Sequence, residues 1–149
     1  MRGVELKISE FGGLAAQQAV LQGRLDIAMT ALPAESEFPL QVLPLMEHPL
    51  CVLVPRTEEW LQRKSLTLQD VARYPLLVFN EEFSLNRQLH KTFQRLGLSP
   101  TIAIRSGQWD FLAAMVQADM GVAILPEPIC QRLDPTSLLW IPLESELTW

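Results

Sequence analysis

The sequence predicts an α/β fold in which helices cover a largely parallel sheet. Short apolar runs, typical of buried strands, alternate with stretches whose apolar residues recur at helical spacing. Glycine or proline follows most of these segments, as expected where helices and strands end. The 149 residues, 48% hydrophobic and 19% charged, suffice for one domain or a pair of small lobes with a sizeable core.

The first thirty residues are expected to form a strand, helix, strand unit. Residues 4–8 (VELKI) alternate apolar and charged side chains, which predicts a strand. The pair Gly12 and Gly13 leads into the helical run LAAQQAVLQG, with Gly23 at the position of a left-handed cap. Residues 25–30 (LDIAMT) form the second expected strand, and the two strands should pair in parallel through a right-handed crossover.

A polar, proline-bearing connection at 31–44 is the expected crossing between two lobes. The run LCVLV at 50–54 predicts a strand that Pro55 stops, and LLVF at 76–79 predicts another. Between these strands, Thr67 and Asp70 have capping-box spacing. They predict a short helix that must end before the next proline.

Two longer helices are expected in the second half. The first carries an apolar face and ends at Gly97; the residues of this face are Leu85, Leu89, Phe93 and Leu96. A strand, TIAIR, follows at 101–105. The second helix lies within QWDFLAAMVQADM, is apolar on most sides and is therefore expected to be buried almost all round. Gly121 ends it, and VAIL at 122–125 is the strand beyond.

Three loops join an expected strand to a following helix: SEFGGL, NEEFSL and RSGQWD. Parallel strands place such loops at one edge of a sheet, where helix starts direct unpaired amide groups outward. A small molecule, in particular an anion, could bind there without a basic side chain. An alternative stays open, since Ser84 and Ser106 are good N-cap residues whatever the function, and Asp110 would repel an anion.

Charge and motif content argue against several functional classes. The net charge of −5, with basic residues scattered singly, does not suit a nucleic-acid-binding surface. Cys51 and Cys130 lack metal or redox spacing and are expected to be buried thiols, so we expect neither a metal nor a cofactor. His48 and His90 are isolated in the sequence, so both are expected to be structural or solvated rather than catalytic.

Further observations bear on catalysis and location. Glu81 and Glu82 are expected to be a solvated loop edge rather than an acid–base pair, because adjacent side chains point apart. With no convergent catalytic group, the chain is not expected to be an enzyme. No signal sequence opens the chain and no apolar segment approaches the length of a membrane span, so the expected location is the cytoplasm, with no membrane partner.

Four segments together carry a family resemblance that covers nearly the whole chain in order. They are VELKISEFGGLAAQQAVLQGRLDIAMT, PLMEHPLCVLVP, LTLQDVARYPLLVF and FQRLGLSPTIAIRSGQWDFLAAMVQADMGVAILP. The chain resembles the effector-binding domain of LysR-type transcriptional regulators. QGRLDIAM and MVQADMGVAILP are the most specific pieces, although neither is a catalytic motif.

The resemblance implies a two-lobed fold similar to type 2 periplasmic binding proteins, with a small-molecule effector between the lobes. Residues 1–45 would form part of the first lobe, 46–134 the second lobe, and 135–149 a return segment toward the first. The residues implied to contact the effector come from both lobes: Phe11, Gly12, Gly13 and Thr30 from the first, and Phe83, Ser84, Leu85, Gly107 and Gln108 from the second.

The sequence departs from the family pattern at both ends. The winged helix-turn-helix, the linker helix, the first strand and helix of the first lobe and the closing helix are all lacking. DNA would therefore be bound only through an N-terminal domain outside this sequence. The incomplete first lobe and the family's side-by-side dimers both imply self-association. A solute-binding lobe of a transport system and an enzyme on the same lobes are the alternatives.

Overall fold

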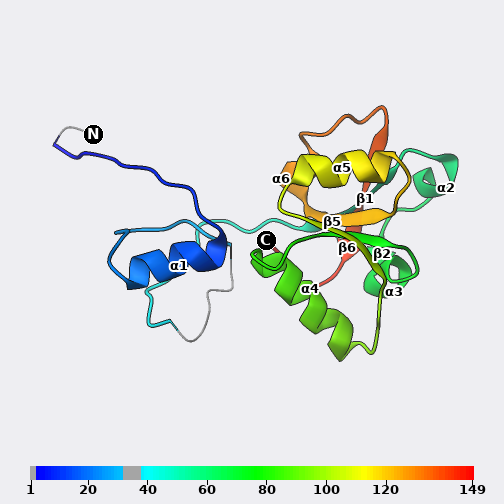
Figure 1. Cartoon of the computed structure of the whole chain (residues 1–149). Helices are drawn as coiled ribbons and strands as arrows, with labels where there is room; N and C mark the ends of the chain where they lie inside the picture. Colours follow the sequence, from blue (N-terminus) through cyan, green and yellow to red (C-terminus); the bar gives the residue numbers. More distant parts are fainter. Residues whose placement is uncertain (1–2, 32–37) are drawn as a thin grey trace.

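The computed structural model describes residues 3–31 and 38–149. Figure 1 shows α1 (Gly13–Leu21) and its flanking segments on one side of the molecule, and the sheet with the remaining labelled helices on the other. The chain between these two parts runs through residues 38–49 without regular secondary structure until its last residues. Helices therefore flank a sheet, which confirms the predicted α/β class.

Within the described residues the sheet has six strands, in the order β2-β6-β1-β5-β3-β4. β3 is parallel to β4 and β5, and β2 is parallel to β6, but β1 is antiparallel to both β5 and β6. The prediction of a parallel sheet is therefore wrong for the centre, where the sheet is mixed. The bounds are β1 Leu50–Pro55, β2 Leu66–Thr67, β3 Leu76–Phe79, β4 Ile102–Ser106, β5 Val122–Pro126 and β6 Leu138–Glu144.

The antiparallel pairing of β1 with β6 follows from where the chain enters and leaves the sheet. The His48 N–H donates to the Trp149 carbonyl at 2.7 Å, and the Trp149 N–H donates to the His48 carbonyl at 2.9 Å. The chain thus enters β1 and leaves β6 at the same place, so the two strands run in opposite directions. Residues 138–144, expected to begin a return segment, form a full strand of this sheet.

Helices cover both faces of the sheet. Figure 1 shows α5 and α6 on one face and α3 and α4 on the other. The central strands β1, β3 and β5 are buried along almost their whole length, as expected for strands covered on both sides. The remaining helix bounds are α2 Glu58–Leu61, α3 Leu68–Val71, α4 Ser84–Arg95, α5 Trp109–Gln117 and α6 Glu127–Cys130.

The predicted capping box at the start of α3 is confirmed. The Thr67 hydroxyl accepts from the Asp70 N–H at 3.1 Å, and the Asp70 carboxylate accepts from the Thr67 N–H at 3.0 Å. The bond from the Thr67 backbone lowers the pKa of Asp70, because it stabilises the charged carboxylate. These two bonds satisfy amide groups that the helix itself leaves unpaired.

Predictions for the longer helices hold in part. α4 ends just before Gly97, whose φ of +69° is the left-handed conformation expected of a terminator, but Leu96 is 42% exposed and does not belong to the buried face. α5 buries only one face, through Leu112, Ala113 and Val116. The prediction that it is buried almost all round is wrong, because α5 packs against the sheet on one side and Phe111 on the other is 43% exposed.

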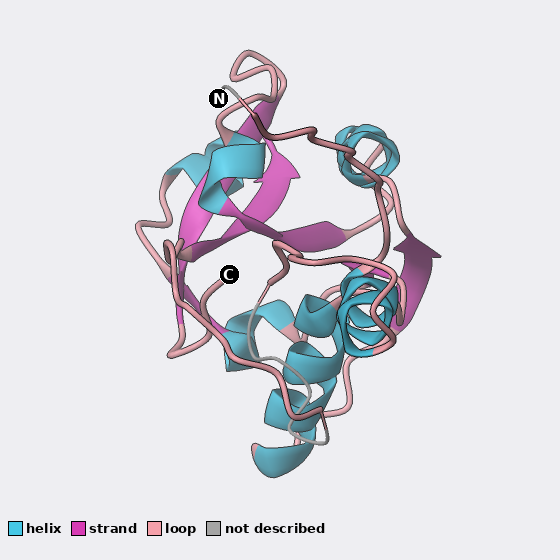
Figure 2. Cartoon of the chain, turned by 90° about the vertical axis from the view of Figure 1, so that its left-hand side faces the viewer, coloured by secondary structure: helices cyan, strands magenta, loops and turns pink. Residues whose placement is uncertain are grey.

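The two strands predicted in the first thirty residues are absent from the structure. Residues 4–8 and 25–30 carry no strand assignment, and Figure 2 draws the segments around α1 as loops. A strand exists only through backbone pairing with a neighbour, and no described strand lies beside either segment. Several of their apolar side chains are therefore exposed: Ile8 and Ile27 are each 85% exposed, and Met29 is 80% exposed.

Candidate functional site

The loops that follow β3 and β4 lie together at one edge of the sheet. β3 and β4 are parallel neighbours, with Phe79 opposite Ser106 at their carboxyl ends. The Asn80 N–H donates to the Ser106 carbonyl at 3.1 Å. A Cβ placed on Gly107 would lie 3.2 Å from Nδ2 of the Asn80 side chain and 3.7 Å from the Phe83 ring. The predicted residues Phe83 and Gly107 are therefore neighbours.

The start of α4 has a buried hydroxyl with no hydrogen-bond partner. Phe83 is the N-cap and Ser84 is the first helical residue, so the alternative that Ser84 caps α4 does not hold. Ser84 is only 9% exposed, and its Oγ has no partner. Phe83 stacks on Phe79 with ring centroids 4.5 Å apart, and Leu85 is 1% exposed. Packing thus fixes the residues on both sides of this hydroxyl.

The first turn of α4 carries no negative charge of its own, and the neighbouring carboxylate is that of Glu82, two residues before Ser84 in the preceding loop. The turn contains no acidic residue, and no side chain caps its amide groups. Such a helix start carries a partial positive charge and unpaired N–H donors. Together with the unpaired Ser84 hydroxyl, this end of α4 can donate hydrogen bonds to an anion.

The start of α1 faces the loop before α4. Gly12 is the N-cap of α1, and a Cβ built on it would lie 3.7 Å from both Cβ and Oε2 of Glu82. α1, which begins at Gly13, also has no acidic residue in its first turn and no side-chain cap. Two uncapped helix starts from opposite sides of the molecule thus approach each other. Phe11, which directly precedes Gly12, is 40% exposed.

The start of α5 is less available to an anion. Gln108 is its N-cap, and the Gln108 N–H donates to the Ser106 hydroxyl at 3.1 Å. The Phe111 N–H donates to the Asp110 carboxylate at 3.0 Å. Side chains therefore already satisfy part of this helix end, and Asp110 adds a negative charge. Thr30, also predicted to contact the effector, is half-buried in the irregular segment after α1, and it is not among the residues that meet at the starts of α1 and α4.

Two residues at this site were not predicted from the sequence. Glu82 is exposed, as expected of a solvated loop edge, but its position beside Gly12 was not predicted. Asn80 ties the two loops together: its side-chain oxygen accepts from the Glu82 N–H at 3.2 Å, and its backbone bonds to β4. A polar residue directly after a buried strand was the available signal for Asn80.

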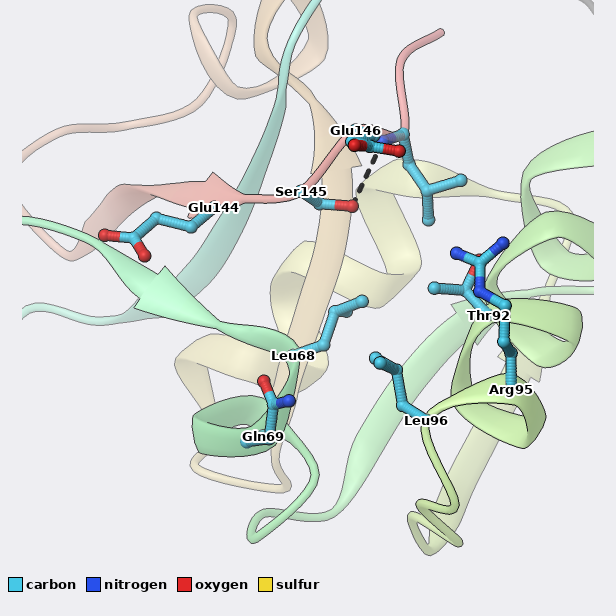
Figure 3. A pocket seen from close by; sticks show the side chains of 9 residues that line it. Leu68, Gln69, Thr92, Arg95, Leu96, Glu144, Ser145 and Glu146 are labelled. Carbon is cyan, nitrogen blue, oxygen red and sulfur yellow. Dashed lines mark hydrogen bonds between the residues drawn. The ribbon is translucent and has the colours of Figure 1, made fainter.

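A cavity of about 410 Å³ lies elsewhere, at the opposite end of α4 (Figure 3). Leu68, Leu96 and Leu147 form apolar walls, and Arg95 and Glu146 lie at its rim. Because α4 has twelve residues, this cavity is roughly 15 Å from the helix start. We favour the starts of α1 and α4 over this cavity as the candidate ligand site. Of the two places, only the helix starts combine unpaired donors, a buried hydroxyl and residues from both parts of the chain.

Other candidate groups are accounted for structurally. His48 stacks on Trp149 with ring centroids 6.2 Å apart, and His90 is exposed on α4. Within residues 3–31 and 38–149, no three His, Cys, Asp or Glu side chains are grouped to hold a metal ion. In the same residues, no helix is both long and apolar enough to cross a bilayer.

Comparisons with known proteins give the family. The model of the LysR substrate binding domain matches residues 2–149. The uncharacterized HTH-type transcriptional regulator YwbI of Bacillus subtilis is 31% identical over 140 residues, which are 94% of this chain and 46% of that protein. The chain thus spans about half the length of this relative.

Solved structures show the same fold. HinK, a LysR family transcriptional regulator from Pseudomonas aeruginosa, aligns with a TM-score of 0.75 at 20% identity, over 99% of this chain and 51% of that one. The BenM effector binding domain with its effector benzoate aligns with a TM-score of 0.71 at 21% identity, over 93% and 63%. Both the sequence and the fold lead to one conclusion: the chain belongs to the LysR substrate binding domain family.

Proposed function

We propose that the chain is the ligand-sensing part of a LysR-family DNA-binding transcriptional regulator, and that it binds a small anionic effector at the starts of α1 and α4. The observation that carries this proposal is the approach of these two uncapped helix starts, with the unpaired Ser84 hydroxyl beside them. The benzoate complex of BenM supports it, since benzoate is a small carboxylate.

The proposal keeps the division into lobes expected from the sequence, with residues 1–45 in the first lobe, 46–134 in the second and 135–149 returning toward the first. The pairing of His48 with Trp149 places both connecting segments side by side, as a hinge between lobes requires. We propose that DNA is bound by a part of the regulator other than these residues, and that the regulator acts in the cytoplasm.

Neither alternative gains support. The relatives and structures that match are transcriptional regulators, which does not support a transport lobe. The family is one of regulators rather than enzymes, so we propose that the chain has no catalytic activity of its own.

A thermal-shift assay with benzoate and benzamide tests the proposed anion site. The two probes have similar shapes, but only benzoate carries a negative charge. We expect benzoate and similar small carboxylates to raise Tm with the logarithm of their concentration, by roughly 5–10 °C at a hundredfold excess over Kd, and the neutral amides to have little effect. Equal stabilisation by each carboxylate and its amide would contradict recognition of charge at helix starts.

Ser84→Ala is the matched variant for this assay. Because the hydroxyl is buried without a partner, its removal should leave the unfolding free energy of the free chain unchanged or slightly higher. The same change should weaken carboxylate binding about tenfold, the worth of one hydrogen bond to a charged group. A loss of stability with unchanged affinity would show that Ser84 serves packing alone.

We also propose that the chain self-associates through the apolar surface around α1. Ile27, Met29 and Leu43 are among its most exposed side chains. Exposed apolar side chains of this size favour covering by another chain. Light scattering at high protein concentration should give a dimer or larger species, and Ile27→Glu with Met29→Glu should shift it toward the monomer. Leu61→Glu, on α2, is the control, and a strictly monomeric mass for the unaltered chain would count against the proposal.

A further inference from the structure

A second, smaller cavity lies between α2 and the turn that follows α5. Its volume is about 180 Å³, and its lining includes two aromatic residues, Trp60 and Tyr74, and two acidic residues, Glu59 and Asp119. None of the described residues that line it is basic. Pockets for drug-sized ligands hold roughly 300–1,000 Å³, so this cavity suits a smaller molecule.

The sheet places this cavity at the edge opposite the start of α4. Pro55, Pro75 and Val122 are among its walls, so it lies where β1 ends and where β3 and β5 begin. α4 follows the other end of β3. Figure 1 accordingly shows α2 at the opposite end of the molecule from α1. The cavity is therefore separate from the proposed effector site.

An aromatic pair forms one wall of the cavity. The ring centroids of Trp60 and Tyr74 are 4.9 Å apart, with an angle of 53° between the ring planes, and Trp60 is only 7% exposed. The Tyr74 N–H donates to the Val71 carbonyl at 3.1 Å, which holds Tyr74 against the end of α3. Aromatic rings carry negative charge density on their faces and therefore attract cations.

The turn after α5 holds Asp119 at the cavity. The Asp119 N–H donates to the Val116 carbonyl at 2.9 Å, and the Met120 N–H donates to the Met115 carbonyl at 3.0 Å. Asp119 has a φ of +61°, a left-handed conformation that aspartate adopts more readily than most residues. These bonds fix an acidic residue in the cavity lining.

The basic residues that are closest in the sequence do not neutralise the acidic lining. Arg63, three residues after Trp60, forms an ion pair with Asp70 at 3.1 Å. Arg73, directly before Tyr74, is exposed and does not line the cavity. The cavity therefore combines aromatic walls with an excess of negative charge.

We propose that this cavity binds a small organic cation of the quaternary ammonium class, as a second ligand site of the chain. A quaternary ammonium group has no N–H to donate, so it is held by aromatic faces, apolar contact and opposite charge. Trp60 and Tyr74 supply the first, Met120 adds apolar surface, and Glu59 and Asp119 supply the charge. Binding there does not require an effector at the starts of α1 and α4.

An NMR titration with choline tests the proposal, with 3,3-dimethylbutan-1-ol as the neutral molecule of the same shape. Tyr74 is the only tyrosine in the chain, so its ring signals identify the site directly. At constant ionic strength, choline should shift these signals saturably, with a Kd in the millimolar range, and the neutral alcohol should have little effect. Equal shifts with both molecules, or no saturable shift with choline, would overturn the proposal.

Asp119→Asn is the variant that tests the charge. Asparagine also adopts the left-handed conformation readily, so the fold should be kept. Loss of one carboxylate should raise the Kd for choline about two- to fivefold. Asp26→Asn is the control, because Asp26 is exposed beyond α1 and its replacement changes the net charge equally. Equal weakening by both variants would mean that choline responds to net charge alone, which would contradict a site at the cavity.

Replacements of Tyr74 test the aromatic wall. Tyr74→Phe should keep the Kd for choline, followed by isothermal titration, whereas Tyr74→Leu should raise it about tenfold. The unaltered chain should bind choline equally well when it is saturated with benzoate, because the two sites lie apart. Unchanged affinity in Tyr74→Leu, or competition between choline and benzoate, would overturn the proposed second site.

Discussion

Gly121→Ala is expected to lower the free energy of unfolding by about 3–5 kcal/mol. A Cβ at this position would lie 2.3 Å from the Pro75 carbonyl oxygen and 2.5 Å from a Leu77 methyl group. The backbone cannot move aside cheaply, because the Pro75 oxygen also accepts from the Val122 N–H at 2.9 Å and thereby joins β3 to β5. The φ of +153° adds a strain of roughly 1–3 kcal/mol for a residue with a side chain.

Gly97→Ala is the matched control for the effect of φ alone. Gly97 also has a positive φ, +69°, but nothing lies within 4 Å of the position its Cβ would take. Alanine there should cost only about 1–2 kcal/mol, the ordinary penalty of the left-handed conformation. Urea unfolding of the three proteins measures both effects. Similar losses in the two variants would mean that the Pro75 contact does not restrict the site.

Gly107→Leu is expected to abolish the stabilisation that a bound carboxylate gives, while changing the stability of the free chain by less than about 1 kcal/mol. Gly107 is exposed and its φ is not in the left-handed region, so the fold tolerates a side chain. That side chain would nevertheless crowd Asn80 and Phe83, which hold the loop before α4. The ligand would then lose both space and correctly placed donors.

Ala103→Leu controls for added bulk on β4, the strand that leads into Gly107. Ala103 is exposed on β4, three residues before the end of the strand. This variant should keep the full shift in Tm with benzoate, and isothermal titration should give an unchanged Kd. If Gly107→Leu also kept the full response, the loop between β4 and α5 would play no part in the site.

The sequence predicts the strands of the second part well because their signals are local. Apolar runs bounded by proline or glycine located β1, β3, β4 and β5, and the spacing of Thr67 and Asp70 located α3. Strand direction depends on contacts that are distant in the sequence. The sheet is mixed because β1 pairs antiparallel with both β5 and β6, and no local pattern reveals either pairing.

The same reason explains the misplaced strands and the incomplete site. Residues 4–8 and 25–30 have strand-like patterns, but pairing requires a neighbour that the described residues do not supply. For the site, the sequence indicated the three loops and their glycines. It did not indicate that Glu82 meets Gly12, or that Phe83 rather than Ser84 caps α4, because tertiary packing decides both.

Amide chemical shifts during a titration with benzoate test the central proposal most directly. Binding at the helix starts predicts saturable shifts in the amides of Gly12, Gly13, Ser84 and Leu85, where the ligand accepts hydrogen bonds. The amides of Leu68, Leu96 and Leu147, at the cavity beyond the far end of α4, should stay in place. Shifts confined to these cavity residues, with none at Gly13 or Ser84, would contradict an effector site between α1 and α4.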